Sequence, residues 1–460
     1  MIRLRVAAAV GLFPLILAGC ASVPRDSGFS DVRRTVVEET KQTIEWDQNE
    51  PVRPPDDSAV ASLLQEELTP DRAVRVAFVN NRDLQATFED LGIARAELIA
   101  ASTIRNPLVH AEVRFPASPI TPFEFGFTKS LIDLLNLGSR KKLGRAQFEV
   151  ARVRVSAAVI NFATEVRMSY FDLLAARKIL ARQETIMKTQ EAATELSQRQ
   201  HVAGNISDLD LENEQARYEQ VKLDHARAQL EELMAREHLS ANLGLVHRAE
   251  LKLPDEFEAP PAAETTEEEV MAQAMARRLD IRMAQREIEA AEAALGVTRT
   301  AALDGLEAGA HVEREPEGTK TAGPSVEIPV PIFDRGSAQK ARARAMLRQV
   351  RQRFAALTSQ ARSEARAALE RLLEARSRMI YMREVVIPRR DRILKLTQLE
   401  YNAMLRGVFQ LLEARQNLAS AERDEIMATR DYWVGRTGLE SALQGVSQFS
   451  VRSDGKKLER

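Results

Sequence analysis

Apolar side chains recur along this chain at two spacings, and the two spacings occupy separate blocks. In the long blocks they return every third or fourth residue, as in Ile160, Ala163, Val166, Tyr170 and Leu173. This spacing predicts helices that pack along one face. In short blocks such as residues 108–115, apolar and polar residues alternate, which predicts strands with one apolar face. The same order of blocks occurs twice.

The chain therefore divides into two internal repeats, residues 68–249 and 264–443, joined by an acidic, proline-bearing linker at 250–263. Each repeat predicts a short helix, a second helix, two strands, a helix of about sixty residues and a returning helix of about thirty-five. The strands are expected at about 108–115, 123–128, 306–313 and 325–332. The expected fold class is mostly α with a small β part, built from long antiparallel helical hairpins that span about 90 Å.

Glycines are predicted to break each hairpin at its far end. The first break is expected at Gly204 and the second at Gly407, because glycine commonly ends a helix. Pro388 lies inside the second long helix, where a missing N–H and a ring clash predict a bend or an end and restart. The flanking segments, 20–67 and 444–460, are polar and mixed in pattern.

Composition narrows the class of protein without naming it. The chain has 65 basic and 67 acidic residues, so no overall charge favours nucleic acid as a partner. The charged fraction is 29% and the aromatic fraction 5%, which is typical of long packed helices. We find no phosphate loop, nucleophile elbow, zinc motif or paired-carboxylate arrangement, and we expect no enzyme and no bound cofactor.

The single cysteine lies in a specific setting near the start of the chain. Arg3 and Arg5 precede a short apolar run, and Leu17-Ala18-Gly19-Cys20 resembles a bacterial lipobox. We expect residues 1–19 to be a lipoprotein signal peptide and Cys20 to carry a covalent lipid; the alternative is an ordinary signal peptide with an incidental cysteine. Ala21 in place of aspartate favours the outer membrane. No other stretch reaches eighteen apolar residues, so a membrane-spanning part would be a barrel.

Several motifs in a fixed order carry a resemblance to a known family. They are Leu68-Thr69-Pro70-Asp71-Arg72-Ala73-Val74, Arg105-Asn106-Pro107, Ile328-Pro329-Val330-Pro331-Ile332-Phe333-Asp334-Arg335-Gly336 and Leu411-Leu412-Glu413-Ala414-Arg415-Gln416. Over residues 68–443 the chain resembles the TolC family of outer-membrane efflux proteins, in its lipidated branch. The run Tyr401-Asn402-Ala403-Met404 is similar to members that accompany heavy-metal or copper resistance systems.

The resemblance implies a homotrimer in the outer membrane lipid. Each protomer would give four strands to a shared 12-stranded β-barrel, and the helices would form a trimeric α-helical tunnel through the periplasm. Such a protein is a passive conduit that works with a periplasmic adaptor and an inner-membrane pump, here leaning to metal ions as the exported solute. The alternative is a periplasmic adaptor lipoprotein of the membrane fusion type. That class has one hairpin flanked by β-rich halves, whereas two hairpins are expected here.

The resemblance also assigns candidate residues at the hairpin ends. The positions matching the adaptor-contact tips are Val202, Ala203, Gly204, Leu405, Arg406, Gly407 and Val408. The position matching a periplasmic gate is Glu413, with Gln410, Asp208 and Asp210 in the same region. Threefold symmetry would turn a lumen-facing acid into a ring that selects cations. The alternatives are a simple helix stop for each glycine and a solvated helix face for each acid.

Histidine and glutamate are paired on two of the expected strands. His110 and Glu112 share a strand face, and His311 and Glu313 repeat the arrangement. Imidazole and carboxylate can ligate a divalent metal, so the pairs are candidate lumen metal contacts. The simpler alternative is that a barrel lumen must be polar.

Overall fold

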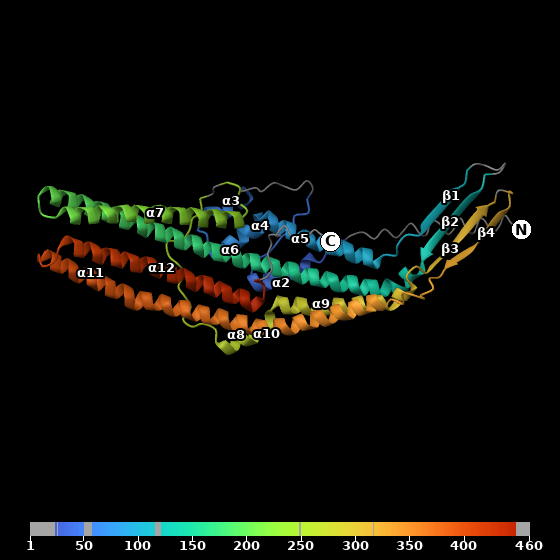
Figure 1. The fold of residues 1–460 in the computed structure, drawn as a ribbon. Coiled ribbons are helices and arrows are strands. Elements are labelled where there is room, and N and C mark those ends of the chain that lie inside the picture. Colours follow the sequence, from blue (N-terminus) through green and yellow to red (C-terminus); the bar gives the residue numbers. More distant parts are fainter. Residues whose placement is uncertain are drawn as a thin grey trace. The chain divides into compact units, whose positions relative to one another are not determined.

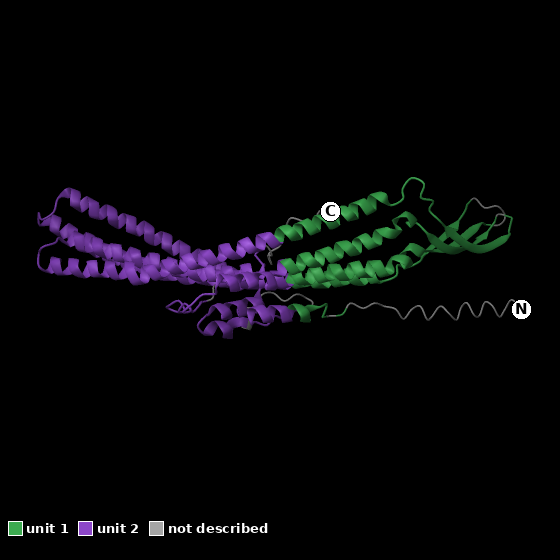
Figure 2. Cartoon of the chain, turned by 90° about the horizontal axis from the view of Figure 1, so that it is seen from below, with its two compact units in different colours: residues 1–32, 88–155, 281–357 green, residues 33–87, 156–280, 358–460 purple. Residues whose placement is uncertain are grey.

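The computed structural model describes residue 24 and residues 26–49, 58–115, 121–247, 250–315 and 317–447. Cys20 and the signal peptide lie outside the described residues. The chain divides into two compact units, coloured separately in Figure 2: unit 1 comprises Met1–Val32, Phe88–Val155 and Ile281–Leu357, and unit 2 the remainder. No helix among the described residues is both long and apolar enough to cross a membrane.

Unit 1 contains one antiparallel sheet in the order β1-β2-β3-β4 (Figure 1). Its strands are β1 Leu108–Val113, β2 Phe123–Ser130, β3 Glu307–Arg314 and β4 Lys320–Glu327. Repeat one supplies β1 and β2, repeat two supplies β3 and β4, and the β2–β3 pairing joins the repeats. The register places Phe125 opposite both Ala111 and Val312, so one face of the sheet is apolar, as the alternation predicts.

The fourth strand differs from the prediction of 325–332. It lies at Lys320–Glu327, and residues 328–332 are unpaired. Pro329 and Pro331 lack the N–H that a ladder needs, which explains why the alternation of apolar residues there does not continue the strand. Pro324 is tolerated inside β4 because β4 is an edge strand.

Helices of unit 1 continue directly from the sheet. Helix α6, Leu131–Val202, begins at the residue after β2, and α10, Ser337–Tyr381, follows β4 after a short connection. They are joined by α9, Leu279–Val297, with the 3₁₀ turn η2 at Thr298–Leu303, and by most of α5, Arg82–Ser102. The start of α2, Phe29–Thr40, packs here, with Phe29 edge-on to Phe88 at a ring-centroid distance of 5.0 Å.

Unit 2 contains the two helical hairpins, to which α6 contributes from residue 156 and α10 from residue 358. In the first, α6 meets the returning α7, Asp208–Asn242; in the second, α10 and α11, Ile387–Asn402, meet α12, Val408–Gln444. Shorter helices complete the unit: α3 Ser58–Gln65, α4 Pro70–Asn80 and α8 Glu267–Arg277. The N-cap predicted at Thr69 is confirmed, since its hydroxyl accepts from the Arg72 N–H at 3.2 Å.

The core of unit 2 lies where α6 and α12 pack together. Tyr170 and Tyr432 are 2% and 0% exposed and are among the largest fully buried side chains. Beside them Trp433 of α12 stacks on Phe171 of α6, with ring centroids 5.4 Å apart and an interplanar angle of 17°. These aromatic contacts join the two hairpins within unit 2.

The second long helix passes Pro388 through a wider turn. Between α10 and α11 lies a π-helical turn, η3, at Met382–Val386, and the Ile387 N–H donates to the Met382 carbonyl five residues back. Pro388 then occupies the first turn of α11, a position at which proline is tolerated. The interruption predicted at Pro388 is thus a change of helical winding within a continuous rod.

Candidate functional site

The hairpins end in two turns with the same backbone. We call residues 203–207 the first turn and residues 403–407 the second turn. In the first, the Gly204 N–H donates to the His201 carbonyl at 2.8 Å; in the second, the Met404 N–H donates to the Tyr401 carbonyl at 2.9 Å. The next backbone hydrogen bond also matches, from Asn205 to the Gln200 carbonyl in the first turn and from Leu405 to the Glu400 carbonyl in the second. Gly204 therefore corresponds to Met404, and the later residues correspond in order.

This correspondence corrects the predicted position of the second break. Gly204 has φ +74°, as expected for a glycine that ends a helix. In the second turn the left-handed residue is Met404, with φ 59°, and Gly407 has an ordinary φ of −79° as the N-cap of α12. Gly407 is therefore the equivalent of Ser207. A left-handed conformation costs a non-glycine residue about 1 kcal/mol or more.

The two turns also start their returning helices differently. Ser207 forms a capping box with Asp210: its hydroxyl accepts from the Asp210 N–H at 3.1 Å, and an Asp210 carboxylate oxygen lies 3.3 Å from the Ser207 N–H. Gly407 provides no such side chain. Its partner position is Gln410, the equivalent of Asp210. Two acids predicted for the gate thus have local contacts, because Asp208 also pairs with His201 at 2.6 Å.

Apolar side chains at the turns are exposed. Met404 is 93% exposed, Leu405 76% and Val202 86%. Arg406 bends back to Glu400, with its Nε 2.7 Å from a carboxylate oxygen. The other predicted tip residues, Ala203, Gly204 and Gly407, are exposed, and Val408 is half-buried. The left-handed Met404 and its neighbour Leu405 are therefore largely exposed apolar side chains at the end of the second hairpin.

Glu413 lies on α12, exposed, with no ion pair or hydrogen bond to another described residue. One turn further, the Gln416 side-chain amide donates to Oε1 of Gln190 at 2.5 Å and so joins α12 to α6. Gln190 in turn donates to Glu214, which is 3% exposed, at 3.0 Å. Sequence analysis missed this link, since glutamine and glutamate are frequent throughout these helices and nothing in their spacing distinguishes the buried ones.

The polar face of the sheet aligns the predicted histidines and glutamates in two rows. His110 and His311 flank Gly126 across β1, β2 and β3. The next row contains Glu112, Glu124 and Glu313, of which Glu124 was not predicted. Three carboxylates side by side repel one another unless a cation lies among them.

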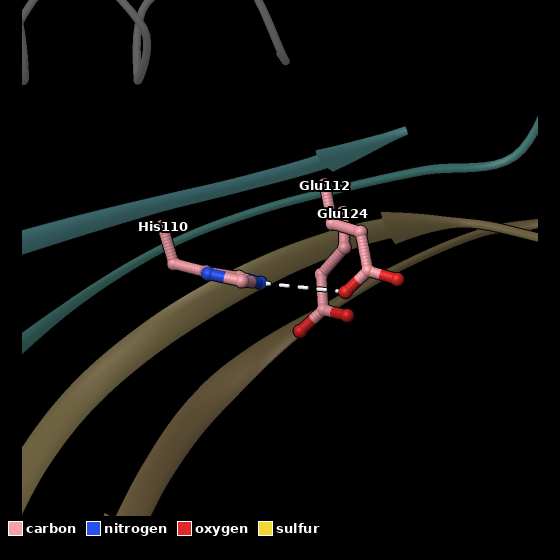
Figure 3. Close-up of side chains that lie close together, drawn as sticks. All are labelled: His110, Glu112 and Glu124. Atoms are coloured by element: carbon pink, nitrogen blue, oxygen red, sulfur yellow. Dashed lines mark ion pairs between the residues drawn. The ribbon is translucent and has the colours of Figure 1, made fainter. Parts of the chain in front are cut away.

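Arg114 supplies a cation to this row. Its guanidinium lies 2.9 Å from Glu112, 3.4 Å from Glu124 and 3.7 Å from Glu313. His110 lies on the other side, with its Nε2 3.6 Å from a Glu112 oxygen. Figure 3 shows the imidazole and the two carboxylates converging, and one ligand atom from each of His110, Glu112 and Glu124 lies within 4.8 Å of the others.

A group of cations that the sequence analysis did not single out lies on the helices just after the sheet. We call this group the basic band; its members are Lys141, Lys142, Arg145, Arg342, Arg344 and Arg348. All six are exposed, and none forms an ion pair with another described residue. An exposed apolar side chain precedes each of the two sequence segments of the basic band: Leu135 is 62% exposed and Phe333 is 99% exposed. Apolar residues followed by Lys and Arg are typical of a membrane interface.

Comparisons with known proteins agree with this architecture. The family model described as "Outer membrane efflux protein" matches residues 73–245 and 270–445, which span both repeats. No curated protein matches the chain.

Solved structures share the fold at low sequence identity. The structure of CusC is 18% identical, covers 87% of this chain and 99% of its own, and has a TM-score of 0.66. The Campylobacter jejuni CmeC outer membrane channel is 16% identical, covers 90% and 92%, and has a TM-score of 0.68. The open state of the Neisseria gonorrhoeae MtrE outer membrane channel is 17% identical, covers 83% and 90%, and has a TM-score of 0.66.

Proposed function

Because the chain belongs to the outer membrane efflux protein family, we propose that it is the passive outer-membrane channel of a tripartite export system. The single observation that carries this proposal is the match of one family model to both repeats. The two-hairpin, four-stranded fold supports it as well. It also disfavours the alternative of a periplasmic adaptor, a class with one hairpin between β-rich halves.

If the sheet lies in the membrane, one four-stranded chain cannot close a barrel alone, and we propose the homotrimer as the assembly that closes it. Its two edge strands, β1 and β4, have unpaired backbone groups, and its apolar face is exposed, with Val109 at 65% and Val326 at 62%. Closed barrels begin at about eight strands. Three copies, each giving four strands, would close the edges and turn the apolar face to lipid.

Cysteines at Ala111 on β1 and Ala322 on β4 test this assembly. Both positions lie on the apolar face of an edge strand. In membranes, a bifunctional thiol reagent should link copies into a species of three chains. A matched pair on the central strands, Phe127→Cys and Ala308→Cys, should link only within one chain. If both cysteine pairs were cross-linked only within single chains, the trimer would be contradicted.

We place the protein in the outer membrane, with its helical hairpins in the periplasm and a lipid on Cys20. The basic band supports this placement, because Lys and Arg near anionic headgroups contribute about 1 kcal/mol each. Mass spectrometry of the mature chain should find Cys20 as the first residue with a diacylglycerol and acyl chains. An unmodified thiol at Cys20 would refute the lipid anchor.

The hairpin turns are the proposed contact with a periplasmic adaptor, and the energy comes from an inner-membrane pump. Support comes from the exposure of the apolar side chains of Met404 and Leu405, at 93% and 76%. The acid Glu413 remains the candidate for a narrow, cation-selecting ring. Single-channel recording of Glu413→Ala should show reduced cation selectivity, while Glu422→Ala, further along α12, serves as a control; equal selectivity in all three channels would remove the gate role.

For the exported solute we favour metal ions over organic compounds. The support is the run Tyr401-Asn402-Ala403-Met404 and the histidine and glutamate side chains on the polar face of the sheet. Deletion of the gene should lower the concentrations of Zn²⁺, Cu²⁺ or related ions that stop growth, with complementation restoring them. Sensitivity confined to dyes and antibiotics would overturn the metal preference and leave the channel function intact.

A further inference from the structure

We propose that His110, Glu112 and Glu124 form a weak, exchangeable binding site for a divalent transition-metal cation of the Zn²⁺ type. The three residues lie on β1 and β2, on the polar face of the sheet (Figure 3). Binding itself is a property of this one chain. Only the idea that exported cations meet the site rests on the proposed function.

The geometry needs little change to hold the ion. Zn²⁺ bonds nitrogen and oxygen ligands at about 2.0–2.2 Å, which sets tetrahedral ligand atoms about 3.3 Å apart. The His110 Nε2 and a Glu112 oxygen already stand 3.6 Å apart, and all three ligand atoms lie within 4.8 Å of one another. His110 lies opposite Gly126, which has no side chain, and His311 flanks the same glycine from β3.

Charge favours a cation at this place. Glu112 lies directly opposite Glu124, and like charges in a cross-strand pair are unfavourable. An imidazole with two carboxylates is a donor set suited to Zn²⁺, with water completing the coordination.

Arg114 makes the site weak. Its guanidinium binds the same two carboxylates, at 2.9 Å and 3.4 Å, and so balances their charge when no metal is bound. A divalent cation must displace this arginine before both carboxylates are free to ligate. Competition of this kind gives fast release, which suits a position that a passing ion must leave.

His311 provides a matched control from the same row of the sheet. Its strand carries Glu313 two residues on, which repeats the sequence pattern of His110 and Glu112. Yet His311 belongs to no group of three potential ligands and makes no ion pair with Glu313 among the described residues. The two pairs that the sequence shows as equivalent are therefore distinct in the structure.

Calorimetric titration with ZnCl₂ tests the site on the full chain, purified in detergent through a tag without histidine. Zinc should bind the unaltered protein, and His110→Ala or Glu124→Gln should weaken binding at least tenfold. His311→Ala should change it less than twofold, and Arg114→Gln should tighten it at least threefold. The altered side chains are on the strand surface, and thermal unfolding curves matching the parent confirm that each variant is folded.

Three results would overturn the proposal: no zinc binding by the parent chain, equal loss in His110→Ala and His311→Ala, or no tightening in Arg114→Gln. Equal loss would indicate a diffuse polar surface in place of one site. This test is independent of the test of the proposed function. Zinc binding is measured on the purified chain, whereas the metal sensitivity of the deletion strain is measured in cells. A chain that exports metal yet binds none here would refute this site alone.

Discussion

The first and second turns share one backbone but are built from different residues. The first turn places Gly204 at the left-handed position and caps its returning helix with Ser207 and Asp210. The second places Met404 at the left-handed position and has the uncapped Gly407. The first turn therefore minimises backbone energy. The second has a strained backbone at Met404, and the side chains of Met404 and Leu405 are exposed.

The difference is an energetic cost at the second turn that the first turn does not have. A non-glycine residue at positive φ costs about 1–2 kcal/mol, and such strain persists only where the rest of the structure or a function maintains it. Met404 and Leu405 are 93% and 76% exposed, so burial among the described residues offsets little of this cost. The proposed adaptor contact would supply the offsetting interaction.

The largest expected effect comes from removing these two apolar side chains. The double variant Met404→Ser, Leu405→Ser should reduce export at least tenfold while leaving the unfolding temperature unchanged, since neither side chain is buried. Export is measured as growth against the compounds to which gene deletion sensitises the cells. Val202→Ser, which removes an exposed apolar residue from the first hairpin, should reduce export less. Equal reductions would show that the two turns contribute alike, and full export by the double variant would remove the contact.

A second, smaller effect tests the strain itself. Gly204→Ala should destabilise the first turn by about 1 kcal/mol, and Met404→Gly should stabilise the second by about the same amount. Hydrogen–deuterium exchange of peptides covering each turn reports local opening. Met404→Ala keeps a Cβ at the left-handed position and serves as the control, with exchange close to the parent. Slower exchange in Met404→Ala than in Met404→Gly would contradict a strained second turn.

The smallest effect concerns the caps. Ser207→Ala should destabilise the start of α7 by about 1 kcal/mol through loss of the capping box. Gly407→Ser should stabilise the start of α12 by a few tenths of a kcal/mol, because glycine is already a fair N-cap and Gln410 stands where a capping-box partner is needed. Amide exchange of the first turn of each helix measures both changes. Lower protection in the Gly407→Ser variant than in the parent would show that Gln410 does not act as the partner.

The fold was largely predictable because its signals are long and periodic. Apolar residues at helical spacing in the long blocks predict the hairpins, and one-sided alternation predicts β1, β2 and β3 to within two residues at each end. The fourth strand was predicted with the wrong bounds, because the apolar alternation of Val326 and Ile328 continues past its end. The prolines that follow cannot pair. Pattern alone does not show where a ladder stops.

The candidate sites were less predictable, for a local reason. Glycine is the residue preferred at a left-handed position, so the sequence predicted the helix break at Gly407. In the structure the left-handed residue is Met404. A residue under strain contradicts its own propensity, which is why sequence reasoning fails at such a place. Glu124 was not predicted as a candidate metal contact for another reason. Only the β1–β2 register brings it beside Glu112, and the register is not visible in the sequence pattern of one strand.

The stack of Trp433 on Phe171 gives the protein a built-in optical reporter. The chain has two tryptophans, so Trp46→Phe leaves Trp433 as the sole indole emitter. The residue is 9% exposed, and its indole N–H has no hydrogen-bond partner among the described residues, so its emission should be blue-shifted. A motion of α12 against α6 that opens this stack should expose the indole to water and red-shift its emission. Unlabelled protein could thus report hairpin movement in real time.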